Sequence, residues 1–205
     1  VNGVYLEDTI LGIIPTGSGN DFAKMIGIRS MSDGLNSLNS SCKKAVDVGF
    51  LNNDKYFINN LGIGIDACVV AKQKELKFKH ESSYLISTLK IASAFRAFPI
   101  EVESPDFKFS GNVLSISIGN GQFHGGMFRL TPQEEIDDGL LDVCIIKEVN
   151  KLKRFLNIPK VVCGSHIFLK EVVVFKAKRI SVSSPVSLPF HLDGELFDSL
   201  KELEI

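Results

Sequence analysis

The sequence predicts an α+β protein in which a short α/β segment, residues 1–44, precedes a larger antiparallel β-rich domain, residues 45–205. Two observations carry this prediction. Near the start of the chain, a strand pattern, a glycine-rich turn and a helical pattern follow one another, as in an α/β unit. After about residue 44, short runs rich in β-branched and aromatic residues recur, and several of them alternate between polar and apolar positions.

The first segment reads as one strand, one turn and one helix. Residues 10–15, ILGIIP, are apolar and end at a proline, which predicts a buried strand of a parallel sheet. The glycine-rich turn TGSGN follows, and DFAKMIGI predicts a short helix that starts near Asp21.

The turn before this helix is the first candidate site. Gly17 and Gly19 let the backbone approach a ligand closely, and free amides at a helix start attract phosphate. Ser18 and Asn20 could cap the helix or bind a phosphoryl oxygen, and Asp21 could hold a magnesium-bound water. On the local pattern alone an ordinary capped turn is the better interpretation. The turn is not a Walker A loop, because the Gly-Lys-Ser/Thr ending is absent.

The rest of the chain predicts strands and two helices. Alternation is clearest at residues 113–118, where one face is polar and the other apolar. Tyr84–Phe98 places apolar residues on one helical stripe, and Asn150–Cys163 predicts a second helix although Pro159 lies inside it. Strands are predicted in AVDVGFL, KYFINNLGIGI, FKFSGNVLSISIGN, LLDVCIIKEV, EVVVFKAKRISVSS and LPFHL.

Two later turns carry acidic side chains. Asp137-Asp138-Gly139 could bind a hard cation through oxygen atoms, and Asp193-Gly194-Glu195 would display Glu195, which could take a proton from an attacking alcohol. Taken locally, a hairpin turn is the better interpretation of both. His124 could act as an acid or base, but without a visible partner a packed or exposed histidine is favoured.

Composition excludes several classes of protein. The chain has 205 residues, 44% hydrophobic and 23% charged, with a net charge of −1, which argues against a nucleic-acid binder. No apolar run reaches the roughly 18 residues of a transmembrane helix, and the start does not resemble a signal peptide. The four cysteines include no CxxC pair, so neither zinc nor disulfides are expected. These features predict a cytoplasmic, reduced protein.

Four segments stand out by their order along the chain: LGIIPTGSGNDFAK, FINNLGIGIDA, NGQFHGGMFRLTPQEEIDDGLLDV and LPFHLDGE. Together they strongly resemble the diacylglycerol kinase and sphingosine kinase catalytic family, and most of all its soluble bacterial lipid kinases, and the resemblance covers nearly the whole chain. It implies that residues 1–44 are the remnant of an α/β nucleotide-binding domain, that residues 45–205 form a β-sandwich on the substrate side, and that the active site lies in the cleft between them.

The resemblance implies ATP and Mg²⁺ as cofactors and a lipid hydroxyl as the acceptor, with diacylglycerol as the default substrate. Sphingoid bases, phosphatidylglycerol and undecaprenol remain open. Within the Gly17–Asn20 turn, Ser18 and Asn20 would contact ATP phosphates, with Ser18 standing where threonine is more usual. Asp21 would join a magnesium and water network with Glu195, and Glu195 would act as the base on the lipid hydroxyl.

A second, structural magnesium site is also implied by the resemblance. The carboxylate of Asp138 would hold this ion together with the carbonyl oxygens of Glu135 and Leu140.

The family carries a Gly-Gly-Asp-Gly-Thr motif just before the part that resembles VNGVYLEDTI, and this chain begins after that point. We therefore expect most of the nucleotide-binding domain to be missing and the chain alone to be inactive. The expected partner is a lipid at the membrane surface, and unpaired strand edges leave a homodimer open. One alternative is a non-catalytic lipid-binding or regulatory module. Another, ranked low, is an NAD-kinase-like enzyme, because NGQFHGGMFRLTP and LDGE fit the lipid kinases better.

Overall fold

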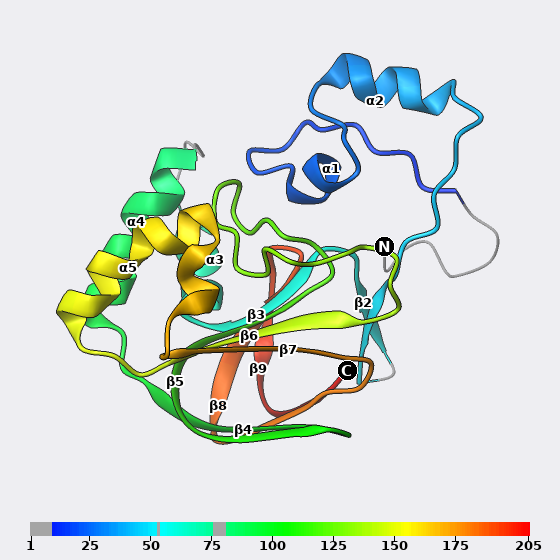
Figure 1. Ribbon diagram of the computed structural model, residues 1–205. Coiled ribbons are helices and arrows are strands. Elements are labelled where there is room, and N and C mark those ends of the chain that lie inside the picture. Colours follow the sequence, from blue (N-terminus) through cyan, green and yellow to red (C-terminus); the bar gives the residue numbers. More distant parts are fainter. Residues whose placement is uncertain (1–9, 53, 76–80) are drawn as a thin grey trace.

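The computed structural model describes residues 10–52, 54–75 and 81–205 and confirms the α+β class (Figure 1). The helices are α1 (Asp21–Met25), α2 (Met31–Leu38), α3 (Ile65–Lys74), α4 (Glu81–Ala94), α5 (Lys151–Cys163) and the 3-10 helix η1 (Ser165–Phe168). The strands are β1 (Gly49–Leu51), β2 (Lys55–Phe57), β3 (Asn60–Gly64), β4 (Phe98–Ser104), β5 (Phe107–Gly119), β6 (Leu141–Lys147), β7 (Val172–Ala177), β8 (Ser181–Leu192) and β9 (Glu195–Glu204).

Two long strands, β5 and β8, organise the sheet. The C-terminal part of each pairs with β3 and the N-terminal part of each pairs with β4, always antiparallel. Register shifts interrupt the pairing of β5 with β6 and of β8 with β9, as bulges do where strands bend. Since β3 and β4 each bridge the same two strands, the sheet folds over on itself into a sandwich, which β6, β7 and β9 extend.

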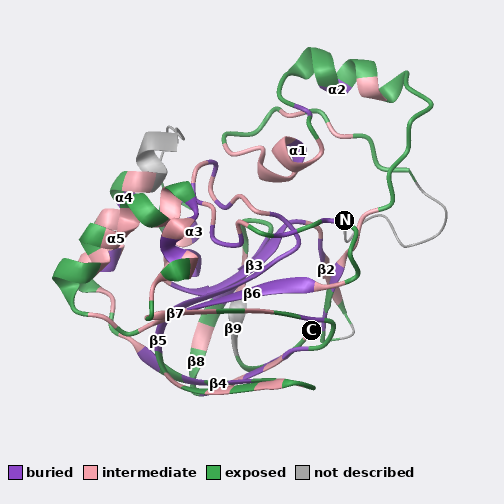
Figure 2. Cartoon of the chain, viewed as in Figure 1, coloured by how far each residue is buried: buried purple, intermediate pink, exposed green. Residues whose placement is uncertain are grey.

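The core lies between the two layers of this sandwich (Figure 2). Residues 113–119 of β5 are all buried, so the predicted alternation at residues 113–118 does not separate a core face from a solvent face. The helices cover that second face, and Ser115 is buried there with its hydroxyl donating to the Ile63 carbonyl at 3.2 Å. The largest fully buried side chains include Phe57, Leu61, Ile63, Ile100, Ile116, Ile118, Ile145 and Ile180.

The N-terminal segment lies beside the sheet rather than in it (Figure 1). The strand predicted at residues 10–15 is not formed, and Ile10 is 63% exposed. A strand needs a neighbour to satisfy its backbone groups, and no described strand pairs with these residues. Helix α2 packs on this stretch instead, and it begins with a capping box between Ser30 and Asp33. The boundary predicted at residue 44 falls in a stretch, 39–48, without helix or strand, and it stays a prediction.

The three predicted helices are confirmed as α1, α4 and α5, whereas α2 and α3 were missed. Helix α4 starts three residues before the predicted range, and α5 starts after Asn150, whose side chain accepts the Lys153 N–H at 2.9 Å. The sequence reading extended a strand through residue 65, whereas Gly64 adopts φ 85° and turns the chain into α3. Among the described helices, none is long and apolar enough to span a membrane.

Truncating a side chain at the centre of the sandwich should strongly lower the free energy of unfolding, because it leaves a cavity in the core. Ile116 is fully buried where β3 and β6 both pair with β5. Ile116→Ala should lower the free energy of unfolding by about 2–5 kcal/mol in urea denaturation. The control Val186→Ala, at a 44% exposed position of β8, should change it by less than about 1 kcal/mol. Equal losses in the two variants would contradict this description of the core.

Candidate functional site

A polar cleft of about 390 Å³ lies between the N-terminal segment and the β-rich body. Its walls come from the 13–23 segment, the β2–β3 connection, α3, the loop around residue 124 and the β8–β9 turn. Four of the predicted residues are there: Ser18, Gly19, Asn20 and Asp21.

Gly126 joins the two sides of the cleft. Its N–H donates to Asp21 Oδ1 at 2.9 Å, and its carbonyl accepts from Lys24 Nζ at 2.6 Å. A Cβ at Gly19 would lie 3.3 Å from the Gly126 nitrogen, so glycine permits this close approach. Burial in the cleft raises the pKa of Asp21, although His124 and the bonds from Gly126 oppose the rise.

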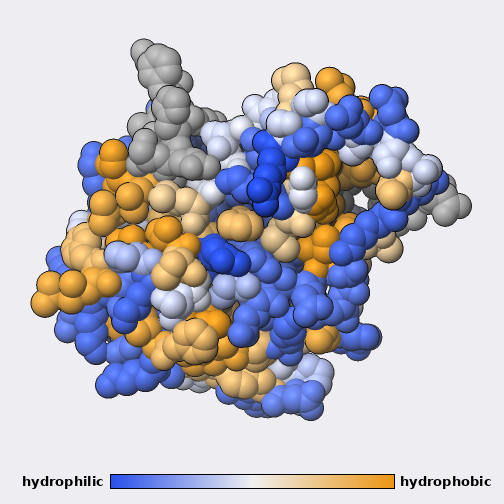
Figure 3. Space-filling model, turned by 45° about the horizontal axis from the view of Figure 1, so that its top comes forward, coloured by the Kyte–Doolittle hydropathy of each residue, from blue (hydrophilic) through white to orange (hydrophobic). Residues whose placement is uncertain are grey.

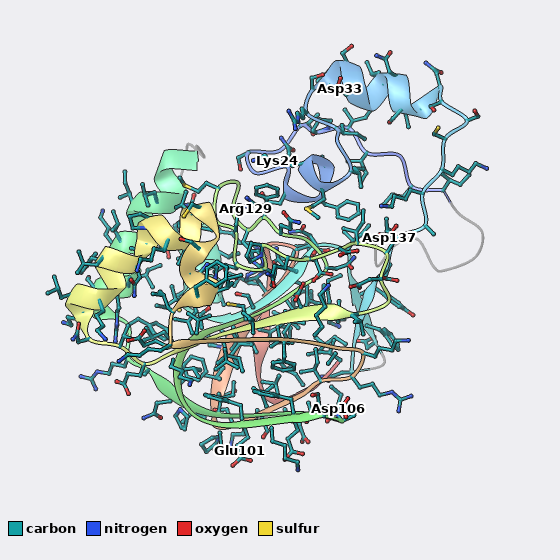
Figure 4. The ribbon with its side chains drawn as sticks, viewed as in Figure 1. Lys24, Asp33, Glu101, Asp106, Arg129 and Asp137 are labelled. Atoms are coloured by element: carbon teal, nitrogen blue, oxygen red, sulfur yellow. The ribbon has the colours of Figure 1, made fainter. Side chains whose placement is uncertain are left out.

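An aromatic ring contacts two cations at the same junction, Lys24 and Arg129, which are labelled in Figure 4. The ammonium of Lys24 and the guanidinium of Arg129 lie 5.9 Å and 5.4 Å from the centre of the Phe123 ring. The Arg129 guanidinium also donates to Gln122 Oε1 at 2.8 Å. These contacts fix the loop that presents Gly126.

The predicted phosphate-binding turn is closed by its own asparagine. Asn20 has φ 51°, and its amide side chain accepts from the Gly17 N–H at 2.9 Å and donates to the Gly17 carbonyl at 2.7 Å. Asn20 stands at the N-cap position of α1, but its side chain makes no capping hydrogen bond because it is used within the turn. Ser18, Gly19 and Asn20 line the cleft, whereas Gly17 does not.

A buried carboxylate between two histidines forms the floor. Asp66 Oδ2 lies 3.4 Å from His124 Nδ1 and 3.2 Å from His191 Nε2, and all three side chains are buried. Burial alone would raise the pKa of Asp66, but the two imidazoles hold it far below its ordinary value. Gly62 of β3 leaves the room for this pair, because a Cβ there would overlap both Asp66 and His191.

The β8–β9 turn is anchored by Asp193. Its carboxylate accepts the backbone N–H groups of Ile58, Asn59 and Asn60 at 2.8–2.9 Å. Positive φ values of 49° at Asp193 and 82° at Gly194 make the tight hairpin turn that the Asp-Gly pair predicted.

Glu195, the predicted base, directly follows that turn. It is the first residue of β9, pairs with Leu192 and is exposed. Asp193 and Gly194 line the cleft, and Glu195 lies just outside its lining. The structure thus brings Asp21 into the cleft and leaves Glu195 at its edge.

The carboxylate predicted to hold a second magnesium ion accepts hydrogen bonds from other groups in this structure. Asp138 accepts from Lys176 Nζ at 2.6 Å and from the Leu140 N–H at 3.0 Å, and Glu135 is exposed. The Lys176 ammonium, also 3.7 Å from Asp142, already supplies positive charge here. The described part of the chain holds no group of three or more His, Cys, Asp or Glu residues suited to a metal ion. The site stays a prediction.

A second cavity, of about 110 Å³ and almost entirely apolar, lies between the sheet and helices α3, α4 and α5. Asp66 contributes to the walls of both this cavity and the polar cleft. The other lining residues include Ile65, Val69, Ala92, Leu114, Phe128, Leu130, Ile146, Ile158, Val161 and Val172.

The sequence reading missed Asp66, His191 and the anchoring role of Asp193. Asp66 comes from α3, His191 from β8 and His124 from a loop, so no local spacing marks the cluster. The sequence did contain one signal for this cluster. Asp66 directly follows the apolar run LGIGI, and a carboxylate in such a position indicates a buried charge that needs partners.

Two family models match the chain. Residues 1–51 match the diacylglycerol kinase catalytic domain, and residues 59–202 match the YegS C-terminal NAD kinase beta sandwich-like domain. A Pectobacterium atrosepticum protein described as "Probable lipid kinase YegS-like" is 31% identical over 90% of this chain and 62% of its own length. The diacylglycerol kinase of Bacillus subtilis is 28% identical over 95% of this chain and 66% of its own. The chain thus spans a little under two thirds of these relatives.

Solved structures share the fold. The crystal structure of a diacylglycerol kinase from Bacillus anthracis overlaps all of this chain and 65% of its own, with a TM-score of 0.70 and 19% identity. A second structure from the same organism has a TM-score of 0.75 and 22% identity, covering 99% of this chain and 68% of its own.

The floor of the cleft predicts that Gly62 tolerates no side chain. Gly62→Ala should lower the free energy of unfolding by about 1–3 kcal/mol, because the methyl group would overlap Asp66 and His191. Urea denaturation measures this. Gly111→Ala is the control, since its Cβ would lie 3.3 Å from the outer end of the Phe109 ring, and a loss as large there would refute the steric explanation.

The buried Glu134 predicts a pH-dependent stability. Burial, and then the adjacent Asp142 carboxylate, raise the pKa of Glu134 well above its ordinary 4.5, so the folded protein keeps a proton that the unfolded chain releases. Stability from this group is complete below about pH 4.5 and declines as the pH rises toward the folded value. Glu134→Gln removes the titrating group. The free energy of unfolding of the variant minus that of the parent should therefore be larger at pH 8 than at pH 5, by at least about 1 kcal/mol.

Denaturation at the two pH values tests this, with the exposed Glu135→Gln as the control. A difference between Glu134→Gln and the parent that is the same at both pH values would show that Glu134 is ionised in the folded protein.

Proposed function

This chain belongs to the diacylglycerol kinase family, among its YegS-like bacterial lipid kinases, and we propose that it carries the lipid side and part of the nucleotide side of an ATP- and Mg²⁺-dependent kinase acting on a lipid hydroxyl. Diacylglycerol is the proposed acceptor, because it is the substrate named for the Bacillus subtilis relative. Activity is proposed for the complete gene product. Homodimer formation stays a prediction.

The adjacency of a polar cleft and an apolar cavity carries this proposal. Asp66 contributes to both walls, so a lipid hydroxyl in the cleft would lie close to space suited to an acyl chain. A soluble acceptor would gain nothing from an apolar cavity of this kind, whereas burial of hydrocarbon there is favourable by about 0.8 kcal/mol for each methylene group. The arrangement therefore favours a lipid acceptor.

The proposed roles in phosphoryl transfer follow from position. The Ser18 and Gly19 backbone, which Gly126 approaches closely, would face the phosphates of ATP. Bound Mg²⁺ would neutralise charge on the phosphoryl oxygens, and Asp21 offers a carboxylate in the cleft to hold such an ion or its water. Glu195 would take the proton of the lipid hydroxyl, from the position that the Asp193 anchor gives the turn.

The proposed base predicts a large kinetic effect. In the complete gene product, Glu195→Gln should lower turnover at least about a hundredfold, because a neutral amide cannot accept the proton. Transfer of labelled phosphate from ATP to diacylglycerol in mixed micelles measures it. Glu202→Gln, an exposed glutamate of the same strand, is the control and should keep normal turnover.

A near-normal rate for Glu195→Gln would remove that residue from the role of base. If the complete gene product transfers phosphate to no lipid while this chain still binds lipid, the alternative of a non-catalytic lipid-binding module replaces the kinase proposal.

A further inference from the structure

The outward face of α5 carries an apolar stripe that the fold does not use. Leu152, Phe155 and Leu156 lie on one side of the helix, and they are 69%, 37% and 63% exposed. No residue of this 13-residue helix is buried. Pro159 and Cys163 continue the stripe at helical spacing and are exposed as well. A surface helix in water normally presents polar side chains on this face.

The opposite face of α5 is also apolar, and it is fixed in place. Ile158 and Val161 line the apolar cavity. Arg154 anchors the helix to the end of α4, since its guanidinium donates to the carbonyls of Ala92 at 3.0 Å and Phe95 at 2.7 Å. The exposed stripe is therefore held outward by contacts on the other side, and α5 forms one wall of the apolar cavity.

Basic side chains flank the stripe. α5 contains Lys151, Lys153, Arg154 and Lys160 and no acidic residue. By helical spacing Lys151 lies on one side of the stripe and Lys160 on the other, both exposed. The space-filling view shows hydrophobic side chains gathered over α4 and α5 at the left of the molecule, next to hydrophilic ones (Figure 3).

We propose that the outward face of α5 docks the protein on an anionic lipid bilayer. Leu152, Phe155 and Leu156 enter the boundary between headgroups and acyl chains, and Lys151 and Lys160 face lipid phosphates. The inference rests on the proposed function in that the membrane then supplies the lipid acceptor. In this orientation only α5 separates the apolar cavity from the acyl chains of the bilayer, which holds the lipid acceptor.

Charge favours a bilayer over a second copy of the chain as the partner. In a two-fold symmetric pair, the same face of each copy meets the other, so two stripes flanked by lysines would bring like charges together. An anionic bilayer offers both apolar depth and negative charge, which matches both parts of this surface.

Vesicle binding tests the proposal without any need for turnover. The 205-residue chain is sedimented with large vesicles of phosphatidylcholine, with or without phosphatidylglycerol. Leu152→Gln/Leu156→Gln should weaken binding about tenfold or more on both. Lys151→Ser/Lys160→Ser should weaken it about tenfold on phosphatidylglycerol vesicles and little on neutral ones. Since these side chains are exposed, circular dichroism should show an unchanged fold.

Matched variants on other elements serve as controls. Met31→Gln/Leu35→Gln on α2 and Lys43→Ser/Lys201→Ser remove exposed apolar and basic side chains elsewhere and should keep binding within about twofold. Equal losses in test and control pairs, or no binding to either vesicle, would overturn the proposal. So would α5 variants that change the oligomeric size of the chain in light scattering but not its vesicle binding. The vesicle assay needs neither ATP nor turnover. Its result would therefore still decide the docking proposal if the kinase proposal failed.

Discussion

The contact centred on Gly126 is the interaction on which the cleft depends. One residue of the β-rich body gives its N–H to Asp21 and its carbonyl to Lys24, at 2.9 Å and 2.6 Å. This pair of bonds holds α1 over the floor that Asp66 forms, and it takes Asp21 out of water, which raises the pKa of Asp21. The hydrogen bond from Gly126 offsets part of that desolvation. Without the contact, the turn and the floor would be two separate surfaces.

Two carboxylates, Asp193 and Asp66, set the remaining geometry. Asp193 satisfies three backbone N–H groups at the start of β3, which fixes the β8–β9 turn and hence the place where Glu195 begins β9. Asp66, between two imidazoles, fixes the boundary between polar cleft and apolar cavity. The Asp66 charge, which would be costly to bury alone, is matched by the two ring nitrogens. The same arrangement suits a reaction in which one end of the acceptor is a hydroxyl and the other is hydrocarbon.

Local patterns in the sequence predicted the α+β class, helices α4 and α5 and the Asp-Gly hairpin, because caps, periodicity and turn residues act over a few positions. The strand predicted at residues 10–15 was wrong, since strand formation depends on a neighbour that local sequence does not reveal. Helix α3 was missed because LGIGIDA resembles a strand until Gly64 turns it. Much of the site was missed for a related reason. Asp66, His124 and His191 come from distant parts of the chain, and tertiary structure alone brings them together.

The most direct test of the account is the rate of phosphoryl transfer to diacylglycerol by the complete gene product carrying Lys24→Met, with Lys43→Met as the control. Methionine keeps the length of the side chain and removes the ammonium that Gly126 binds. If this contact builds the cleft, kcat/KM should fall at least about tenfold in Lys24→Met alone, while the free energy of unfolding changes by less than about 1 kcal/mol. An unchanged kcat/KM would show that phosphoryl transfer does not depend on joining α1 to Gly126, and the cleft would lose its assigned role.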